Sequence, residues 1–108
     1  MTSREAIAGL IETYKKFGWE PRRLVLTDET KNALEPLDGD PPAKVSNIDA
    51  IWFSRPKQAD KTPWELRHLG ETPFSLLEHL GEDSSDFEQQ LSDTERRMAE
   101  SIVGRKPA

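Results

Sequence analysis

The hydrophobic positions of residues 48–69 alternate with a period of two, which is typical of β-strands. In the first half of this stretch, Ile48, Ala50 and Trp52 fall on one face, and Ile51 and Phe53 fall on the other. Because neither face is wholly polar, such a strand needs cover on both sides, from helices of its own chain or from a partner.

Two strands joined by a polar loop are predicted here, at about 48–55 and 64–69. The loop between Pro56 and Pro63 is too long for a two-residue turn, and proline restricts the backbone at both ends. Trp64 and Leu66 share a face of the second strand and should point into the core. A third strand is predicted at about 22–27, so we expect a three-stranded antiparallel sheet centred on a hairpin.

An N-terminal helix is predicted at about 3–17, because apolar residues recur there at helical spacing. Thr2 and Glu5 match a capping box at its start, and Gly18 supplies the left-handed stop that is common after a helix. A brief helix through Leu34, capped by Thr27 or Asp28, is also predicted, and turn-forming residues at 37–42 indicate a loop.

Two C-terminal helices are predicted, at about 73–80 and 86–103. Thr72 and Pro73 suit the start of the first, with Phe74, Leu77 and Leu80 as its buried stripe. The second is either one helix or two that break near Ser92, and the tail from about residue 104 should be frayed.

These elements predict a small α+β protein that forms a single domain over residues 1–108. Hydrophobic residues make up 34% of the chain and charged residues 32%, which leaves a small core with three Trp and four Phe. The absence of cysteine excludes disulfides and fits a reducing compartment, so we expect a cytoplasmic protein. No signal-peptide pattern or membrane-spanning stretch is visible in the sequence.

The net charge of −5 is concentrated in one segment. Residues 70–93 contain no Lys or Arg and seven acids, which are Glu71, Glu78, Glu82, Asp83, Asp86, Glu88 and Asp93. Binding to nucleic acid relies on Lys and Arg that neutralise phosphates, so this charge argues against it. The segment is either a solvated helical face or a docking surface for a basic partner.

No catalytic, cofactor-binding or metal-binding motif is present. The two histidines do not lie at ligand spacing, no serine lies in a Gly-x-Ser-x-Gly motif, and the six glycines are scattered. We therefore predict no catalytic residues, no cofactor and no metal.

Polar residues alternate with large aromatics on the hairpin, where Trp52, Arg55, Trp64, Arg67 and His68 could line an interaction surface or cleft. The leading hypothesis is a non-catalytic protein-interaction or regulatory module, which binds a protein partner or forms a homodimer through a sheet face or edge. The alternative is a small enzyme or ligand-binding domain that uses a cleft on the 48–69 hairpin. Basic residues near the two tryptophans raise nucleic-acid binding as a third, weaker hypothesis.

Overall fold

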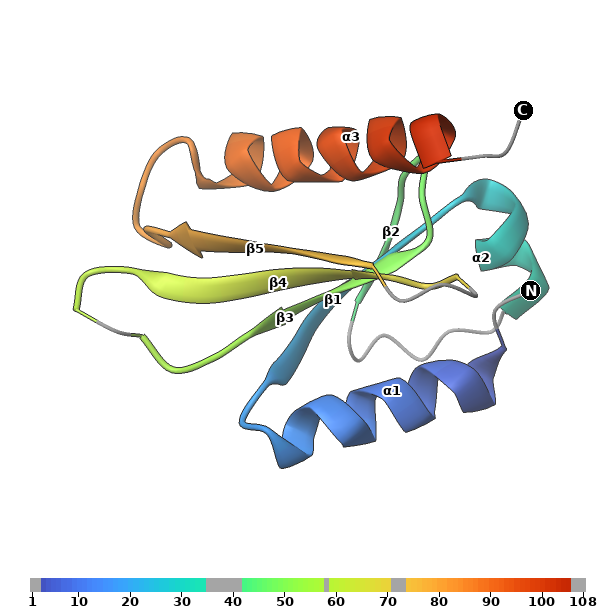
Figure 1. The fold of residues 1–108 in the computed structure, drawn as a ribbon, viewed down its shortest axis with the longest axis horizontal. Coiled ribbons are helices and arrows are strands. Elements are labelled where there is room, and N and C mark those ends of the chain that lie inside the picture. Colours follow the sequence, from blue (N-terminus) through green and yellow to red (C-terminus); the bar gives the residue numbers. More distant parts are fainter. Residues whose placement is uncertain (1–2, 35–41, 58, 71–73, 106–108) are drawn as a thin grey trace.

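The fold is a five-stranded mixed sheet with helices on both faces, as the computed structural model shows (Figure 1). The structure describes residues 3–34, 42–57, 59–70 and 74–105. The elements are α1 (Arg4–Lys16), β1 (Glu20–Leu26), α2 (Asp28–Leu34), β2 (Ala43–Val45), β3 (Ala50–Ser54), β4 (Thr62–His68), β5 (Ser75–Leu80) and α3 (Phe87–Arg105). The strand order is β2-β1-β3-β4-β5, in which β1 and β2 are parallel and all other neighbours are antiparallel.

The predicted hairpin is confirmed as the centre of this sheet. β3 pairs with β4 in a register that places Trp52 opposite Leu66. The alternation read from the sequence also holds: Ala50 and Trp52 pack in one hydrophobic cluster, whereas Ile51 and Phe53 pack in the other.

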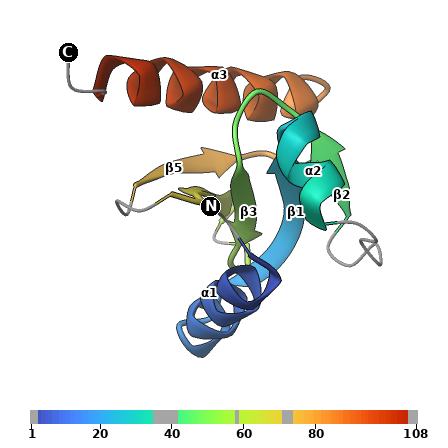
Figure 2. The ribbon, with the colours of Figure 1, turned by 90° about the vertical axis from the view of Figure 1, so that its right-hand side faces the viewer.

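The two clusters lie on opposite faces of the sheet, and each is covered by helices of the chain itself. α1 covers one face and α3 covers the other (Figures 1 and 2), and Leu34 of α2 packs in the cluster on the α1 side. The first cluster centres on Ile7, Leu24, Leu26, Leu34, Ile51 and Phe53. The second centres on Val25, Ile48, Ala50, Trp52, Trp64, Leu66, Leu80, Leu91 and Met98.

The start of α1 differs by one residue from the predicted cap. Ser3 is the N-cap, and its side chain accepts a hydrogen bond of 3.1 Å from the backbone N–H of Ala6. Thr2 lies outside the described residues. At the other end Gly18 has φ +88°, the left-handed conformation expected there.

The predicted helix at 73–80 is wrong, because residues 75–80 form the strand β5. Phe74, Leu77 and Leu80 recur every three residues as in a helix, whereas Phe74, Leu76 and Leu80 share one face of a strand, so the sequence contains both patterns. Pairing with β4, for example of Leu66 with Leu76, decides the conformation, since tertiary contacts override local propensity. Leu77, a member of the predicted buried stripe, is instead 54% exposed.

The sheet therefore has five strands, not the predicted three. The short strand β2 was missed because its three residues follow a segment rich in turn formers. It reaches β1 through a connection that contains α2, as a parallel pairing requires. The predicted loop at 37–42 lies almost wholly outside the described residues.

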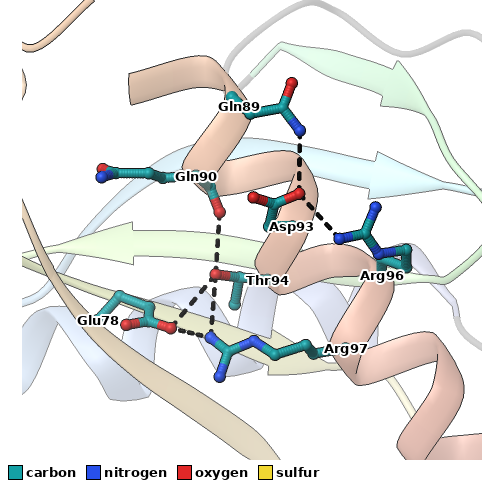
Figure 3. A network of polar contacts seen from close by, with 7 residues as sticks. All are labelled: Glu78, Gln89, Gln90, Asp93, Thr94, Arg96 and Arg97. Carbon is teal, nitrogen blue, oxygen red and sulfur yellow. Dashed lines mark hydrogen bonds and ion pairs between the residues drawn. The ribbon is translucent and has the colours of Figure 1, made fainter. Parts of the chain in front are cut away.

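The question of one or two helices at 86–103 is settled, because α3 is continuous. Polar contacts attach it to β5: the Arg97 guanidinium donates to Glu78, and the Thr94 hydroxyl lies 3.4 Å from the same carboxylate (Figure 3). α3 runs to Arg105, and most of the tail predicted from about residue 104 lies outside the described residues. None of the helices in the described part of the chain has the length and hydropathy to cross a membrane.

Candidate functional site

An open cleft of about 740 Å³ lies at the end of the sheet where β4 ends and β3 begins. The N-terminal half of α1 and the start of α2 form its other walls, at the end of the molecule that faces the viewer in Figure 2. Its described lining residues are Ala6, Leu10, Thr27, Glu29, Thr30, Asp49, Arg67, His68, Leu69 and Gly70. A volume of this size is within the range of ligand pockets, about 300–1,000 Å³.

Asp49 holds one wall of the cleft together. Its carboxylate accepts hydrogen bonds from the Thr27 backbone N–H at 2.8 Å and from the Thr30 hydroxyl at 2.7 Å. The Thr27 hydroxyl in turn accepts from the Thr30 backbone N–H at 3.2 Å, which caps α2 as the sequence predicted. Asp49 therefore ties the start of β3 to the start of α2, and much of its hydrogen-bonding capacity is used within the protein.

The imidazole of His68 is partly buried in the cleft, and its ring nitrogens form no hydrogen bond with the described residues. Burial lowers its pKa below the ordinary value of 6.5 and Arg67 adds to this shift, whereas the Asp49 charge opposes it, so the ring is neutral at pH 7. A Cβ on Gly70 would lie 2.5 Å from the Cε1 atom of His68, so the absence of a side chain at residue 70 makes room for the ring. No hydrogen bond to the ring nitrogens is found within the described residues, which leaves one donor and one acceptor available.

Arg67 is already partly engaged. Its guanidinium donates to the backbone carbonyl of His68 at 2.5 Å, and it lies close to the hydrogen-bonded pair of Tyr14 and Glu65. Burial and the Glu65 carboxylate raise the pKa of Tyr14, while Arg67 acts in the opposite direction. The Tyr14 ring stacks on Phe53 with 4.0 Å between the ring centroids. This group fixes α1 to the sheet beside the cleft.

The cleft combines an apolar wall with a slightly acidic polar one. Among the described lining residues, Ala6, Leu10 and Leu69 supply hydrophobic surface, and the two carboxylates of Asp49 and Glu29 accompany one guanidinium, that of Arg67. Phosphates and other strong anions are held by clustered cations or free backbone N–H groups, which the described part of this lining does not gather. The arrangement suits a partly apolar group whose polar end is neutral or cationic.

The five residues predicted to line an interaction surface or cleft do not come together. Arg67 and His68 line the cleft. Trp52 and Trp64 are buried in the core under α3, with exposed fractions of 0% and 3%. Arg55 lies at the opposite end of the hairpin, where it stacks 4.9 Å from the Trp19 ring centroid and donates to the Phe17 carbonyl.

The remaining cleft residues were missed because they come from α1, α2 and the loops flanking the hairpin. The only local signal was the Thr27 cap, which sequence reasoning assigned to helix initiation alone. Asp49 forms hydrogen bonds with Thr27 and Thr30, about twenty residues away in the sequence, and the spacing of residues does not predict such contacts.

Four of the seven acids in the acidic segment form ion pairs with arginines of the chain within the described residues. These pairs are Glu78 with Arg97, Glu82 with Arg22 at 3.9 Å, Glu88 with Arg23 at 3.0 Å, and Asp93 with Arg96 at 3.1 Å. Arg22 also stacks on Trp64, whose indole N–H donates to Glu82 at 2.8 Å. These contacts weaken the argument for a basic docking partner at this segment.

No group of three His, Asp or Glu side chains in the described ranges is placed to hold a metal ion. Comparison of the chain with protein-family models, with curated proteins and with solved structures gave no significant match in any of the three.

Proposed function

We propose that this protein is a non-catalytic recognition module, which takes a side chain of a protein partner into the cleft between α1, α2 and the end of β4. The preferred side chain has an apolar body and a neutral or cationic polar end. The observation that supports this most directly is the position of the His68 imidazole, half-buried beside apolar wall residues and without a hydrogen-bond partner among the described residues; burial also lowers its pKa.

The residues around His68 support binding rather than turnover. The hydroxyls of Thr27 and Thr30 both lie within hydrogen-bond distance of Asp49, so neither is poised as a nucleophile. The Asp49 carboxylate is engaged by α2 and does not orient the imidazole through a hydrogen bond. A cleft with a hydrogen-bonded polar wall, apolar wall residues and one available imidazole has the features of a binding site.

The proposal can be tested with N-acetyl amino-acid amides as models of partner side chains. We expect the tyrosine and lysine derivatives to shift the backbone amide resonances of Leu10, His68 and Gly70, and the glutamate derivative to leave them unchanged. Ala6→Trp should fill the cleft and remove the shifts. Ala8→Trp is the matched control, because Ala8 is also exposed on α1 but does not line the cleft.

Two results would contradict the proposal: no shift with any derivative at millimolar concentration, or equal shifts in the Ala6→Trp variant and the wild type. A preference for the glutamate derivative would reverse the charge argument.

A small enzyme is the second candidate, and one observation favours it. An imidazole kept neutral by burial is able to act as a general base at neutral pH. This candidate requires that the protein turn over some member of a panel of model esters, amides and phosphates, and that His68→Gln abolish the turnover without changing the fold. Absence of turnover across the panel would leave the recognition module as the better proposal.

A further inference from the structure

The free edge of β5 is a second surface, separate from the cleft. β5 is the last strand of the sheet, so only one of its edges is paired, with β4. β4 and β5 form an antiparallel ladder in which Thr62 lies opposite Leu80 and Arg67 lies opposite Ser75. No described segment pairs with the other edge.

The hydrogen-bond pattern shows which groups of β5 are free. The backbone N–H of His68 donates to the carbonyl of Phe74 at 2.8 Å, which marks this pair as hydrogen-bonded. Hydrogen-bonded pairs alternate along an antiparallel ladder, so Leu76 and Glu78 also face β4. Ser75, Leu77 and His79 therefore turn their N–H and C=O groups toward the free edge.

The side chain of Leu77 is also exposed to solvent. Leu76 and Leu80 pack under α3, so Leu77 between them faces the other side of the sheet, where it is 54% exposed. Sheet edges that avoid pairing with other chains carry charged side chains, Pro or a bulge. Within its described span, β5 has neither Pro nor a bulge, its one charged residue Glu78 is paired with Arg97, and Leu77 is exposed.

We infer that the β5 edges of two copies of this chain pair antiparallel about a two-fold axis centred on Leu77. This inference does not depend on the function proposed for the cleft.

Symmetry limits the possible registers. Directly opposite residues in a sheet point to the same side, so a two-fold axis perpendicular to the sheet has to pair one residue with its own copy. Centring on Glu78 would place two carboxylates opposite each other. Centring on Leu76 would pair Ser75 with Leu77 and leave the outward groups of His79 without a partner in the described strand.

Centring on Leu77 avoids both faults. It pairs Leu77 with its copy and Ser75 with His79, and these are the residues whose backbone groups are free. Glu78 then lies opposite Leu76 and keeps its own Arg97. The register also covers the exposed leucine with its copy, without placing like charges opposite each other.

Sedimentation velocity over micromolar to millimolar concentration tests this inference. An interface made of one strand pair is small, so we expect a reversible monomer–dimer equilibrium. Leu77→Lys should raise the dissociation constant at least about tenfold, because two ammonium groups would meet at the axis. The control is Val45→Lys, since Val45 is a 46% exposed hydrophobic residue on β2, the opposite edge of the sheet. This control should dimerise like the wild type.

Amide hydrogen exchange provides a second readout that does not depend on a variant. The Leu77 amide should gain protection as concentration rises, whereas the Leu76 amide, already directed at β4, should not change. A wild type that stays monomeric at millimolar concentration would overturn the inference. So would a dimer that survives Leu77→Lys, or one that is lost in Val45→Lys alone.

Discussion

The hydrogen bond between Trp52 and Glu95 places a carboxylate inside the core, and its contribution to stability can be measured. The indole N–H of Trp52 donates to Glu95 at 2.9 Å, while Trp52 is 0% and Glu95 only 7% exposed. The Ser46 hydroxyl lies 3.4 Å from the second carboxylate oxygen of Glu95, and the negative charge of Glu95 contributes to the raised pKa of Arg23. The pair links β3 to α3 across the sheet face.

The expected change in the free energy of unfolding depends on which polar group each substitution leaves without a partner. Trp52→Phe removes the donor and leaves a smaller ring; we expect a loss of about 3–4 kcal/mol in the free energy of unfolding. Glu95→Leu leaves the indole N–H without an acceptor, at a cost of about 2 kcal/mol. In the double variant both polar groups are gone, so the total loss should fall short of the sum by about 1.5–3 kcal/mol.

Urea unfolding followed by far-ultraviolet circular dichroism at pH 7 provides the measurement, because the fluorescence would change with the tryptophan itself. Equal m-values across the four proteins would show that the comparison is between like states. If the loss in the double variant equals the sum of the two single losses to within about 0.5 kcal/mol, the hydrogen bond contributes nothing beyond packing, and the reasoning is refuted.

Three further predictions concern single residues. Gly9→Ala should raise the free energy of unfolding by about 0.5–1 kcal/mol, because a Cβ there meets nothing within 4 Å, whereas Gly18→Ala should lower it by about 1–2 kcal/mol because φ is +88°. Thermal melts that rank the two variants in the opposite order would contradict this. Tyr14 is the single tyrosine, so phenolate absorbance should rise only above its ordinary pKa of 10.0; its stabilising effect is complete below that pH and is lost as pH rises toward the higher folded value. The folded pKa of His68 is lowered, so its contribution to stability is complete above pH 6.5 and is lost as pH falls toward the folded value. An NMR titration of the His68 Cε1 proton that gives 6.5 or higher would contradict this, and His68→Gln should reduce the pH dependence of unfolding.

The fold was predictable in those segments where hydrophobic residues follow one clear period, either that of a helix or that of a strand. The hairpin and α1 combine a clear period with explicit end signals such as Gly18, and both were predicted within about two residues. The two-sided apolar pattern of β3 also predicted that both sheet faces need cover. β5 was not predictable in this way, because its conformation depends on hydrogen bonds to β4, which lie outside any local window.

The candidate site was much less predictable than the fold. Arg67 and His68 were identified because they alternate with aromatics, but the same argument included Trp52 and Trp64, which are core residues. Large aromatics on a strand are more often buried than exposed, and alternation does not tell which face a second helix covers. The other walls of the cleft depend on how α1 and α2 lie over the sheet.

The location of surplus hydrophobic surface changes the argument for self-association. The sequence predicted that the two-faced strand needs cover on both sides, from helices of its own chain or from a partner. The chain covers the two faces of β3 itself, with α1 on one side and α3 on the other, so that reason no longer applies to β3. What remains is Leu77, on a different strand, together with the outward backbone groups of Ser75 and His79. Side-chain exposure and hydrogen-bond direction are independent properties of a strand, and on β5 both are found at Leu77. A monomer would lose nothing by having a charged residue there, whereas a strand-paired dimer would be weakened by one.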